Sequence, residues 1–194
     1  MTGAERMRAL LRELGRLKDV LRSGRTAAGR RESVAEHSWR VAVMALLTAE
    51  AAGADPLRAV GLALVHDLGE ALGGDVPAPE QRPGDDRTAR ERADLDRLLE
   101  AAPAAARARL AALWEEAAAG ETAAARLVKA LDRLETVATH VEGAQAPGFD
   151  WRFNLGYGRD LTDAVPQVRA IRALVDAETR ARLRPPPASG RSTS

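Results

Sequence analysis

The chain has 194 residues, of which 45% are apolar, 29% charged and only 3% aromatic, with a formal net charge of +1 and no cysteine. This composition predicts one globular domain with a core of small aliphatic side chains. The balanced charge gives no reason to expect nucleic-acid binding, and the lack of cysteine excludes disulfides and cysteine nucleophiles. No apolar run approaches the ~20 residues of a membrane-spanning helix, and the N-terminus does not resemble a signal peptide. We therefore expect a cytoplasmic protein with no membrane partner.

The spacing of apolar residues predicts an all-α fold, a compact helical bundle. Helical spacing runs over residues 4–21 and is followed by a polar, glycine-containing loop at 22–33. A second helix is expected over 34–53. A third is expected from the Asp55-Pro56 cap to about Leu72, where Gly73-Gly74 ends it.

The second half of the chain continues this helical pattern. A loop rich in proline and charge at 76–86 precedes helices expected over 87–100, 104–118, 121–142 and 161–183. The segment 143–160 is predicted to be irregular, and it contains four glycines and four of the six aromatic residues. The proline-rich tail 184–194 is predicted to be disordered. We therefore assign residues 1–183 to a single domain and predict no strand.

Ionisable residues interrupt the apolar third helix. His66-Asp67 follows the apolar run 60–65, and Glu70 lies three residues after Asp67, an offset that shares a helix face. Burial of such groups is costly unless they are paired or bound to a metal. From the spacing alone, a metal site and an ordinary structural histidine both remain open.

Two other helices supply similar groups. His37 lies in the first turn of the second helix, and Asp132 lies near the edge of the apolar face of the helix predicted over 121–142. Imidazole and carboxylate ligands together suit Zn, Mn, Fe, Co or Ni better than Ca.

Three segments carry a family resemblance: ESVAEHSW (32–39), ALVHDLGEALGGDVPAP (63–79) and LVKALDRLE (127–135). Their order of one His, then His-Asp, then a distant Asp resembles the signature of the HD-domain phosphohydrolase superfamily. With the preceding RLK…R, the segments are most similar to the small HD-domain 5′-deoxynucleotidase group. The resemblance covers about residues 10–142. It implies a helical bundle around one divalent metal ion (Co, Mn, Zn, Fe, Ni or Mg), and often a homodimer.

The resemblance also implies roles for individual residues. The residues that match the metal ligands are His37, His66, Asp67 and Asp132. Glu70 matches an acidic residue that assists catalysis, and Asp75 matches an aspartate beside the substrate sugar and phosphate, in a catalytic or binding role. Arg22 matches a phosphate- or sugar-contacting arginine. Lys18 and Arg31 are further cations that could hold the phosphate.

The resemblance is incomplete in two places. The deoxynucleotidase group carries a tryptophan after the arginine that helps to exclude a 2′-hydroxyl, whereas Arg22 is followed by Ser23. We therefore expect room for ribonucleotides or another phosphorylated compound. The aromatic residues of 147–158 have no counterpart in that group; they either form a lid that stacks on a base or, as we prefer, pin an irregular loop or a dimer surface. We expect His140 to be structural, Trp39 to pack beside the site and Trp114 to lie in the core.

The function expected from the sequence is removal of the 5′-phosphate from (deoxy)ribonucleoside monophosphates by a metal-activated water. One alternative keeps the site and changes the substrate to a dNTP, releasing triphosphate, or to another small phosphorylated metabolite. Another is a non-catalytic helical binding protein with a vestigial site. A di-iron oxygenase is disfavoured because the chain has only three histidines.

Overall fold

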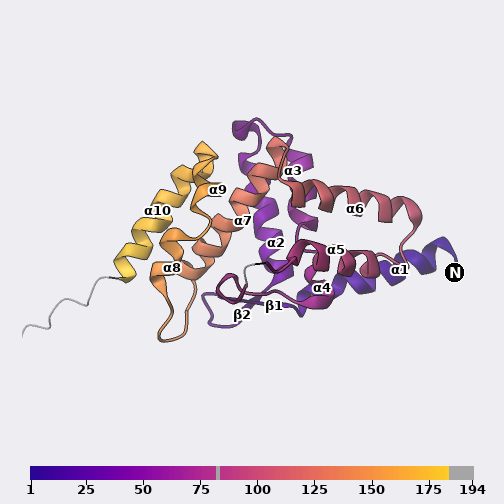
Figure 1. Ribbon diagram of the computed structural model, residues 1–194, viewed down its shortest axis with the longest axis horizontal. Helices are drawn as coiled ribbons and strands as arrows, with labels where there is room; N and C mark the ends of the chain where they lie inside the picture. The colour runs from indigo at the N-terminus through magenta and orange to yellow at the C-terminus, as the bar shows by residue number, and fades with distance from the viewer. Residues whose placement is uncertain (82–83, 184–194) are drawn as a thin grey trace, which may run out of the picture.

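The all-α prediction is confirmed in the computed structural model, which describes residues 1–81 and 84–183 (Figure 1). The first half contains α1 (Gly3–Leu14), η1 (Gly15–Lys18), β1 (Leu21–Arg25), β2 (Arg31–Ser33), α2 (Val34–Thr48), η2 (Glu50–Ala52), α3 (Pro56–Val65), α4 (Glu70–Gly73) and η3 (Ala78–Glu80), where η marks a 3₁₀ turn. The second half contains α5 (Arg87–Leu98), α6 (Ala104–Ala119), α7 (Ala123–Glu142), α8 (Trp151–Gly156), α9 (Arg159–Asp163) and α10 (Pro166–Arg182). The predicted disordered tail 184–194 lies outside the described residues.

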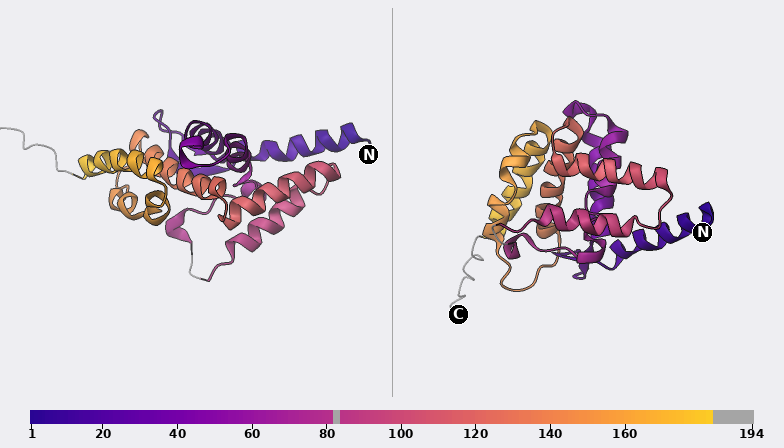
Figure 2. Two further views of the ribbon diagram at one scale, coloured as in Figure 1. Left: turned by 90° about the horizontal axis from the view of Figure 1, so that it is seen from above. Right: turned by 45° about the vertical axis from the view of Figure 1, so that its right-hand side comes forward.

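Three helices, α2, α3 and α7, contact one another and form the centre of the fold. α8, α9 and α10 gather on one side of α7, while α5 and α6 extend on the other side, toward α1 (Figures 1 and 2). The central helices share one apolar cluster that includes Val41, Leu62, Leu127 and Leu131, all fully buried. Among the described residues, no helix combines the length and apolar character that a membrane crossing requires.

A second apolar cluster joins α1, α5 and the end of α3. It includes Leu10, Val65, Leu95 and Trp114, so the predicted core position of Trp114 is confirmed. Leu62 belongs to the first cluster and Val65 and Leu68 belong to the second. The His-Asp pair at 66–67 is therefore fixed where the two clusters meet.

The segment 22–33, predicted as a loop, instead contributes a short antiparallel hairpin. β1 and β2 pair Leu21 with Ser33 and Arg25 with Arg31, with an irregularity between these pairs. β1 lies directly on α7, because a Cβ at Gly24 would come within 3.1 Å of the Thr139 Cγ2. The strands were missed because they are short and charged and show no alternation of apolar residues.

The third predicted helix is also interrupted, at the His-Asp pair. α3 ends at Val65, and the backbone N–H of Leu68 donates to Val65 and that of Glu70 to Asp67, both at 3.0 Å, as in a 3₁₀ turn. Side chains three residues apart lie above one another in such a turn, so Asp67 and Glu70 still share a side. Gly69 permits this turn to approach α5, since a Cβ there would lie 2.6 Å from the Glu91 carbonyl oxygen.

The C-terminal region differs from prediction in two details. The segment 143–160 contains the short helix α8, whose N-cap Asp150 accepts from two backbone N–H groups. The single helix expected over 161–183 is divided between α9 and α10. The division falls at Pro166, which occupies the first position of α10. Both changes concern the part of the chain that packs against α7.

Candidate metal centre and active-site cavity

The four residues predicted as metal ligands come together from three elements. His37 extends from the first turn of α2, His66 and Asp67 from the turn after α3, and Asp132 from the middle of α7. The His37 Nε2 lies 3.3 Å from the Asp132 Oδ1 and 3.7 Å from the Asp67 Oδ2, and the His66 Nε2 lies 3.1 Å from the same Asp67 oxygen. These residues are far apart in sequence, so the fold itself assembles the cluster.

The donor atoms of this cluster fit a cation. Within the described part of the chain, the Nε2 atoms of His37 and His66 and the Oδ2 of Asp67 are buried and have no hydrogen-bond partner. Ligand atoms bound about 2.1 Å from a common ion are separated by roughly 3.0–3.5 Å, which is close to the separations found here. Unpaired buried polar atoms are costly, and a shared divalent ion would satisfy all of them.

Both imidazoles are oriented so that Nε2 faces the cluster. The Nδ1 of His66 lies 2.8 Å from the Ala63 carbonyl oxygen, and the Nδ1 of His37 lies 2.5 Å from the Glu135 Oε2. Each Nδ1–H can therefore donate outward, which leaves the Nε2 lone pair available as a ligand. Neither outer partner was identified from the sequence, although Glu135 stands three residues after Asp132, one helical turn away.

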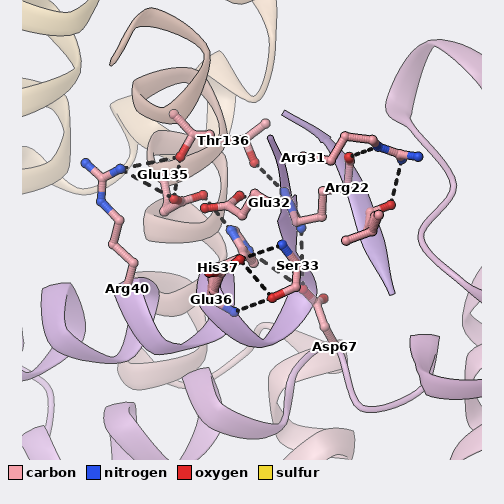
Figure 3. Close-up of polar contacts among 12 residues, drawn as sticks. Arg22, Arg31, Glu32, Ser33, Glu36, His37, Arg40, Asp67, Glu135 and Thr136 are labelled. Carbon is pink, nitrogen blue, oxygen red and sulfur yellow. Dashed lines mark hydrogen bonds and ion pairs between the residues drawn. The ribbon is translucent and has the colours of Figure 1, made fainter. Parts of the chain in front are cut away.

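A buried polar network holds Glu135 in place. Its Oε1 accepts a hydrogen bond from the Thr139 hydroxyl at 2.7 Å and lies 3.7 Å from the Arg40 guanidinium. Figure 3 shows Glu135 and His37 pointing toward each other, with Glu32 beside them and Asp67 on the other side of the imidazole. The network connects α2 to α7 and fixes the His37 ring.

The electrostatics of the cluster favour positive charge. Burial and Arg22 lower the pKa of His37, but Glu135 and Asp132 outweigh them and raise it to about 10. Burial raises the pKa of Asp67 and Asp132, yet neighbouring cationic groups (His66 for Asp67, Arg133 for Asp132) hold both below the usual range. Without a metal ion, the two imidazoles would carry protons at neutral pH. A bound divalent cation would take the place of these protons.

A cavity of about 660 Å³ opens onto this cluster. Its walls include His66, Asp67 and Asp132, and also Arg22 and Asp75. The Arg22 guanidinium is largely buried, donates to the Thr136 hydroxyl at 2.9 Å and lies 3.6 Å from the Asp67 carboxylate. The structure therefore brings Arg22 and Asp75 to the same space as the predicted ligands.

Glu70 lies at the wall of the cavity in an unusual environment. Its Oε1 accepts from Arg87 at 2.5 Å, while its Oε2 is buried and has no hydrogen-bond partner within the described residues. Burial and the nearby carboxylates of Asp67 and Asp75 raise its pKa to about 10, against the opposing charge of Arg87. A raised pKa favours the protonated form of Glu70, which can donate a proton.

Several predicted neighbours of the site lie elsewhere. Lys18 and Trp39 line a separate shallow pocket, and Trp39 is 65% exposed, so its expected packing beside the site is wrong. Arg31 donates from its guanidinium to the carbonyl oxygens of Arg22 and Leu21, both at 2.7 Å. Lys18 and Arg31 do not line the described walls of the cavity.

Sequence reasoning missed other cations that do line the cavity: Arg87, Lys129 and Arg133. Lys129 and Arg133 stand three residues before and one residue after Asp132, so their positions were a usable signal. Arg87 begins α5 after a long loop, and the sequence offers no comparable signal for it.

The aromatic segment also reaches this space. Phe149, Phe153 and Tyr157 line the cavity, whereas Trp151 packs over Arg182, with the guanidinium carbon 5.3 Å from the ring centroid. His140 is buried, and its Nδ1 lies 2.8 Å from the Asn154 Oδ1, in line with the structural role expected for it.

Comparison with known proteins relates this geometry to a family. The family model described as HD domain matches residues 14–172. The chain belongs to the HD domain family. It is 37% identical over 137 residues to the 5′-deoxynucleotidase HDDC2 of Bos taurus and 36% identical over 140 residues to that of Homo sapiens. Each match covers 70% of this chain, and the chain spans only about two thirds of these relatives, 66% and 67% of their lengths.

A solved structure agrees with the assignment. A predicted metal-dependent phosphohydrolase from Magnetospirillum magnetotacticum MS-1 superposes with a TM-score of 0.77 at 31% identity, over 95% of this chain and 96% of that one. The HD-domain fold implied by the sequence resemblance is therefore confirmed over nearly the whole chain.

Proposed function

We propose that this HD-domain chain is a metal-dependent phosphohydrolase that removes the 5′-phosphate from nucleoside monophosphates. The observation that carries the proposal is the convergence of His37, His66, Asp67 and Asp132 in one cluster, three of whose members line a cavity together with Arg22. A cation site beside a guanidinium is suited to a phosphate monoester. The names of the bovine and human relatives support a nucleotide as the substrate.

His37, His66, Asp67 and Asp132 would hold one divalent cation, and this nitrogen and oxygen donor set suits Zn, Mn, Fe, Co or Ni. Bound there, the cation would supply Lewis-acid activation of water and of a phosphoryl oxygen. His37 and His66 are held ready by their outward Nδ1 contacts with Glu135 and with the Ala63 carbonyl oxygen.

Arg22 and Asp75 would position the substrate. Thr136 fixes one edge of the Arg22 guanidinium, so the remaining N–H groups can donate to phosphate oxygens in a site that is largely removed from water. Asp75 lines the same cavity and can accept a hydrogen bond from a sugar hydroxyl.

Glu70 would supply the proton that the leaving group needs. Attack of water on phosphorus forms one P–O bond and breaks the bond to the 5′ oxygen, which leaves as an alkoxide unless it is protonated. Protonated Glu70 gives this oxygen its proton and is then reprotonated from the attacking water. Arg87 keeps the Glu70 side chain oriented during this transfer.

Phosphate release tests the reaction. Chelator-treated protein would be supplied with Co²⁺, Mn²⁺, Zn²⁺ or Mg²⁺ and a panel of ribo- and deoxyribonucleoside 5′-monophosphates. We expect metal-dependent release of phosphate that is lost in His66→Ala and Asp67→Ala and kept in Asp96→Asn, which removes a mostly exposed carboxylate of α5. Release of triphosphate from dNTPs instead, or full activity in the two site variants, would contradict the proposal.

A homodimer and a cytoplasmic location complete the proposal. Support for the dimer comes from large apolar side chains exposed on α2 and α3, including Trp39 at 65%, Leu47 at 77% and Leu57 at 79%. Sedimentation of the purified chain would give a dimer mass, and Leu47→Glu together with Leu57→Glu would reduce it to the monomer mass.

A further inference from the structure

Buried polar groups help to anchor the aromatic segment to the protein. Asn154 is fully buried, and its side chain meets His140. The buried guanidinium of Arg172 donates to the backbone carbonyl oxygens of Asn154 and Tyr157, the second at 2.8 Å, and is itself fixed by Asp176. These contacts hold the backbone of α8, in addition to the contact of Trp151 with Arg182 and the packing of Tyr157 against the central apolar cluster.

Three of the four rings also present exposed surface to the cavity. Phe149, Phe153 and Tyr157 are all only half-buried, and all three line the cavity. Phe153 and Tyr157 stack with a centroid separation of 4.9 Å and an interplanar angle of 29°. In a chain with only 3% aromatic residues, three half-exposed rings in one cavity indicate a planar apolar ligand group.

One side chain ties the rings to the metal-binding cluster. The Arg133 guanidinium donates to the Tyr157 hydroxyl at 2.5 Å, lies 5.1 Å from the Tyr157 ring centroid and contacts the Asp132 carboxylate at 3.2 Å. One guanidinium group therefore bridges the Tyr157 hydroxyl and Asp132, a predicted metal ligand. A phosphate at the cluster and a base at the rings could belong to one ligand.

We propose that Phe149, Phe153 and Tyr157 form a binding site for the nucleobase of the substrate. This inference rests on the proposed function and adds to it the residues that recognise the base, which would separate a nucleotide from the phosphate ester of a simple sugar. The exposed part of the stacked pair Phe153 and Tyr157 would form one side of the base site, and Phe149, set edge-on to His140 at 4.8 Å, would form another. Stacking of this kind tolerates different bases, because every base has a π-face.

Binding of the product nucleoside tests this site without turnover. Titration calorimetry with adenosine and thymidine on the metal-loaded protein would compare the wild type with Phe153→Leu and Phe149→Leu. We expect each substitution to weaken nucleoside binding by about 5- to 150-fold, the usual range for loss of one stacking partner. Trp39→Leu is the control: it removes a ring that is 65% exposed and does not line the described walls of the cavity, and it should change binding less than twofold.

A substrate without a base provides the second arm. Replacement of Phe153 should raise KM for nucleoside monophosphates and leave KM for deoxyribose 5-phosphate unchanged. The base site is overturned if both phenylalanine variants bind nucleosides as the wild type does, or if deoxyribose 5-phosphate is hydrolysed with the same kcat/KM as nucleotides. Nucleoside binding that depends on Phe153 in a protein without phosphatase activity would refute the proposed reaction and retain the base site.

Discussion

The Glu135 carboxylate and the His37 imidazole form a fully buried pair, with Oε2 2.5 Å from Nδ1. The contact joins α7 to α2 and sets which nitrogen of His37 faces the metal-binding cluster. A carboxylate in this position raises the basicity of the imidazole and fixes its ring. Glu135 is therefore a positioning residue for the proposed metal ion, although it lies outside the cluster itself.

Loss of this carboxylate should weaken metal binding. Glu135→Gln keeps the shape of the side chain and removes its charge, and we expect about 10- to 100-fold lower affinity for the preferred metal. Titration of the metal into chelator-treated protein, followed by calorimetry, measures this affinity. Glu142→Gln, which removes an exposed carboxylate of the same helix that also contacts Arg40, should bind metal normally. Unchanged affinity in Glu135→Gln would show that His37 does not need this partner.

Substitution of Glu70 should lower the rate of hydrolysis and leave metal binding unchanged. Glu70→Gln keeps the contact with Arg87 and cannot act as an acid, so we expect kcat to fall by about 10²- to 10⁴-fold. Metal content, measured by plasma emission spectroscopy, should remain at the wild-type level. Glu91→Gln is the comparison, because Glu91 also accepts from Arg87; it should retain activity within a few-fold. A Glu70→Gln protein with wild-type kcat would remove Glu70 from the reaction.

The helices and the His66-Asp67 pair could be predicted from the sequence because both show strong local signals. α7 was placed to within two residues from its apolar spacing, and the His-Asp pair stood out as charge inside an apolar run. Most of the helices lie close to their predicted bounds. The position of His37 against Asp132 was accessible only through the family resemblance, since no local pattern relates α2 to α7.

What the sequence could not give are features decided by tertiary contacts. β1 and β2 are stabilised by each other and by α7, so their residues show no strand pattern. Arg31 was a reasonable phosphate-binding candidate until the hairpin occupied its guanidinium with backbone carbonyl oxygens. Trp151 and Tyr157 make contacts of the anchoring kind preferred for the aromatic segment, whereas the buried contacts of Asn154 and Arg172 that also hold it had no local signal.

Ser23 should determine tolerance for ribose. It is exposed, follows Arg22 on β1 and lines the cavity, where its small side chain leaves room for a 2′-hydroxyl. We expect the wild type to accept ribo- and deoxyribonucleotides, and Ser23→Trp to lower kcat/KM for ribonucleotides by roughly 10- to 100-fold relative to deoxyribonucleotides. Ser23→Ala keeps the space and should keep the wild-type ratio. An unchanged ratio in Ser23→Trp would place the sugar elsewhere.

Glu32 should make the stability of the metal-free protein depend on pH. Burial and the charge of Glu135 raise its pKa from 4.5 to about 7, so between these values the folded state holds a proton that the unfolded state has lost. The stability that this proton contributes is complete below pH 4.5 and is lost as the pH rises through 7. Since each pKa unit corresponds to about 1.4 kcal/mol, the rise from 4.5 to about 7 sets an upper limit of about 3.5 kcal/mol on this loss.

Urea unfolding of chelator-treated protein between pH 4.5 and 8 measures this loss. Glu32→Gln is neutral at every pH, so its free energy of unfolding should fall less between pH 4.5 and 8 than that of the wild type. The decline that remains comes from Glu70 and His37, whose raised pKa values both proteins share. Glu100→Gln, which removes an exposed carboxylate at the end of α5, should follow the wild type throughout. Parallel profiles for the wild type and Glu32→Gln would mean that Glu32 stays ionised in the folded protein, with Arg22, 3.7 Å away, compensating for its burial.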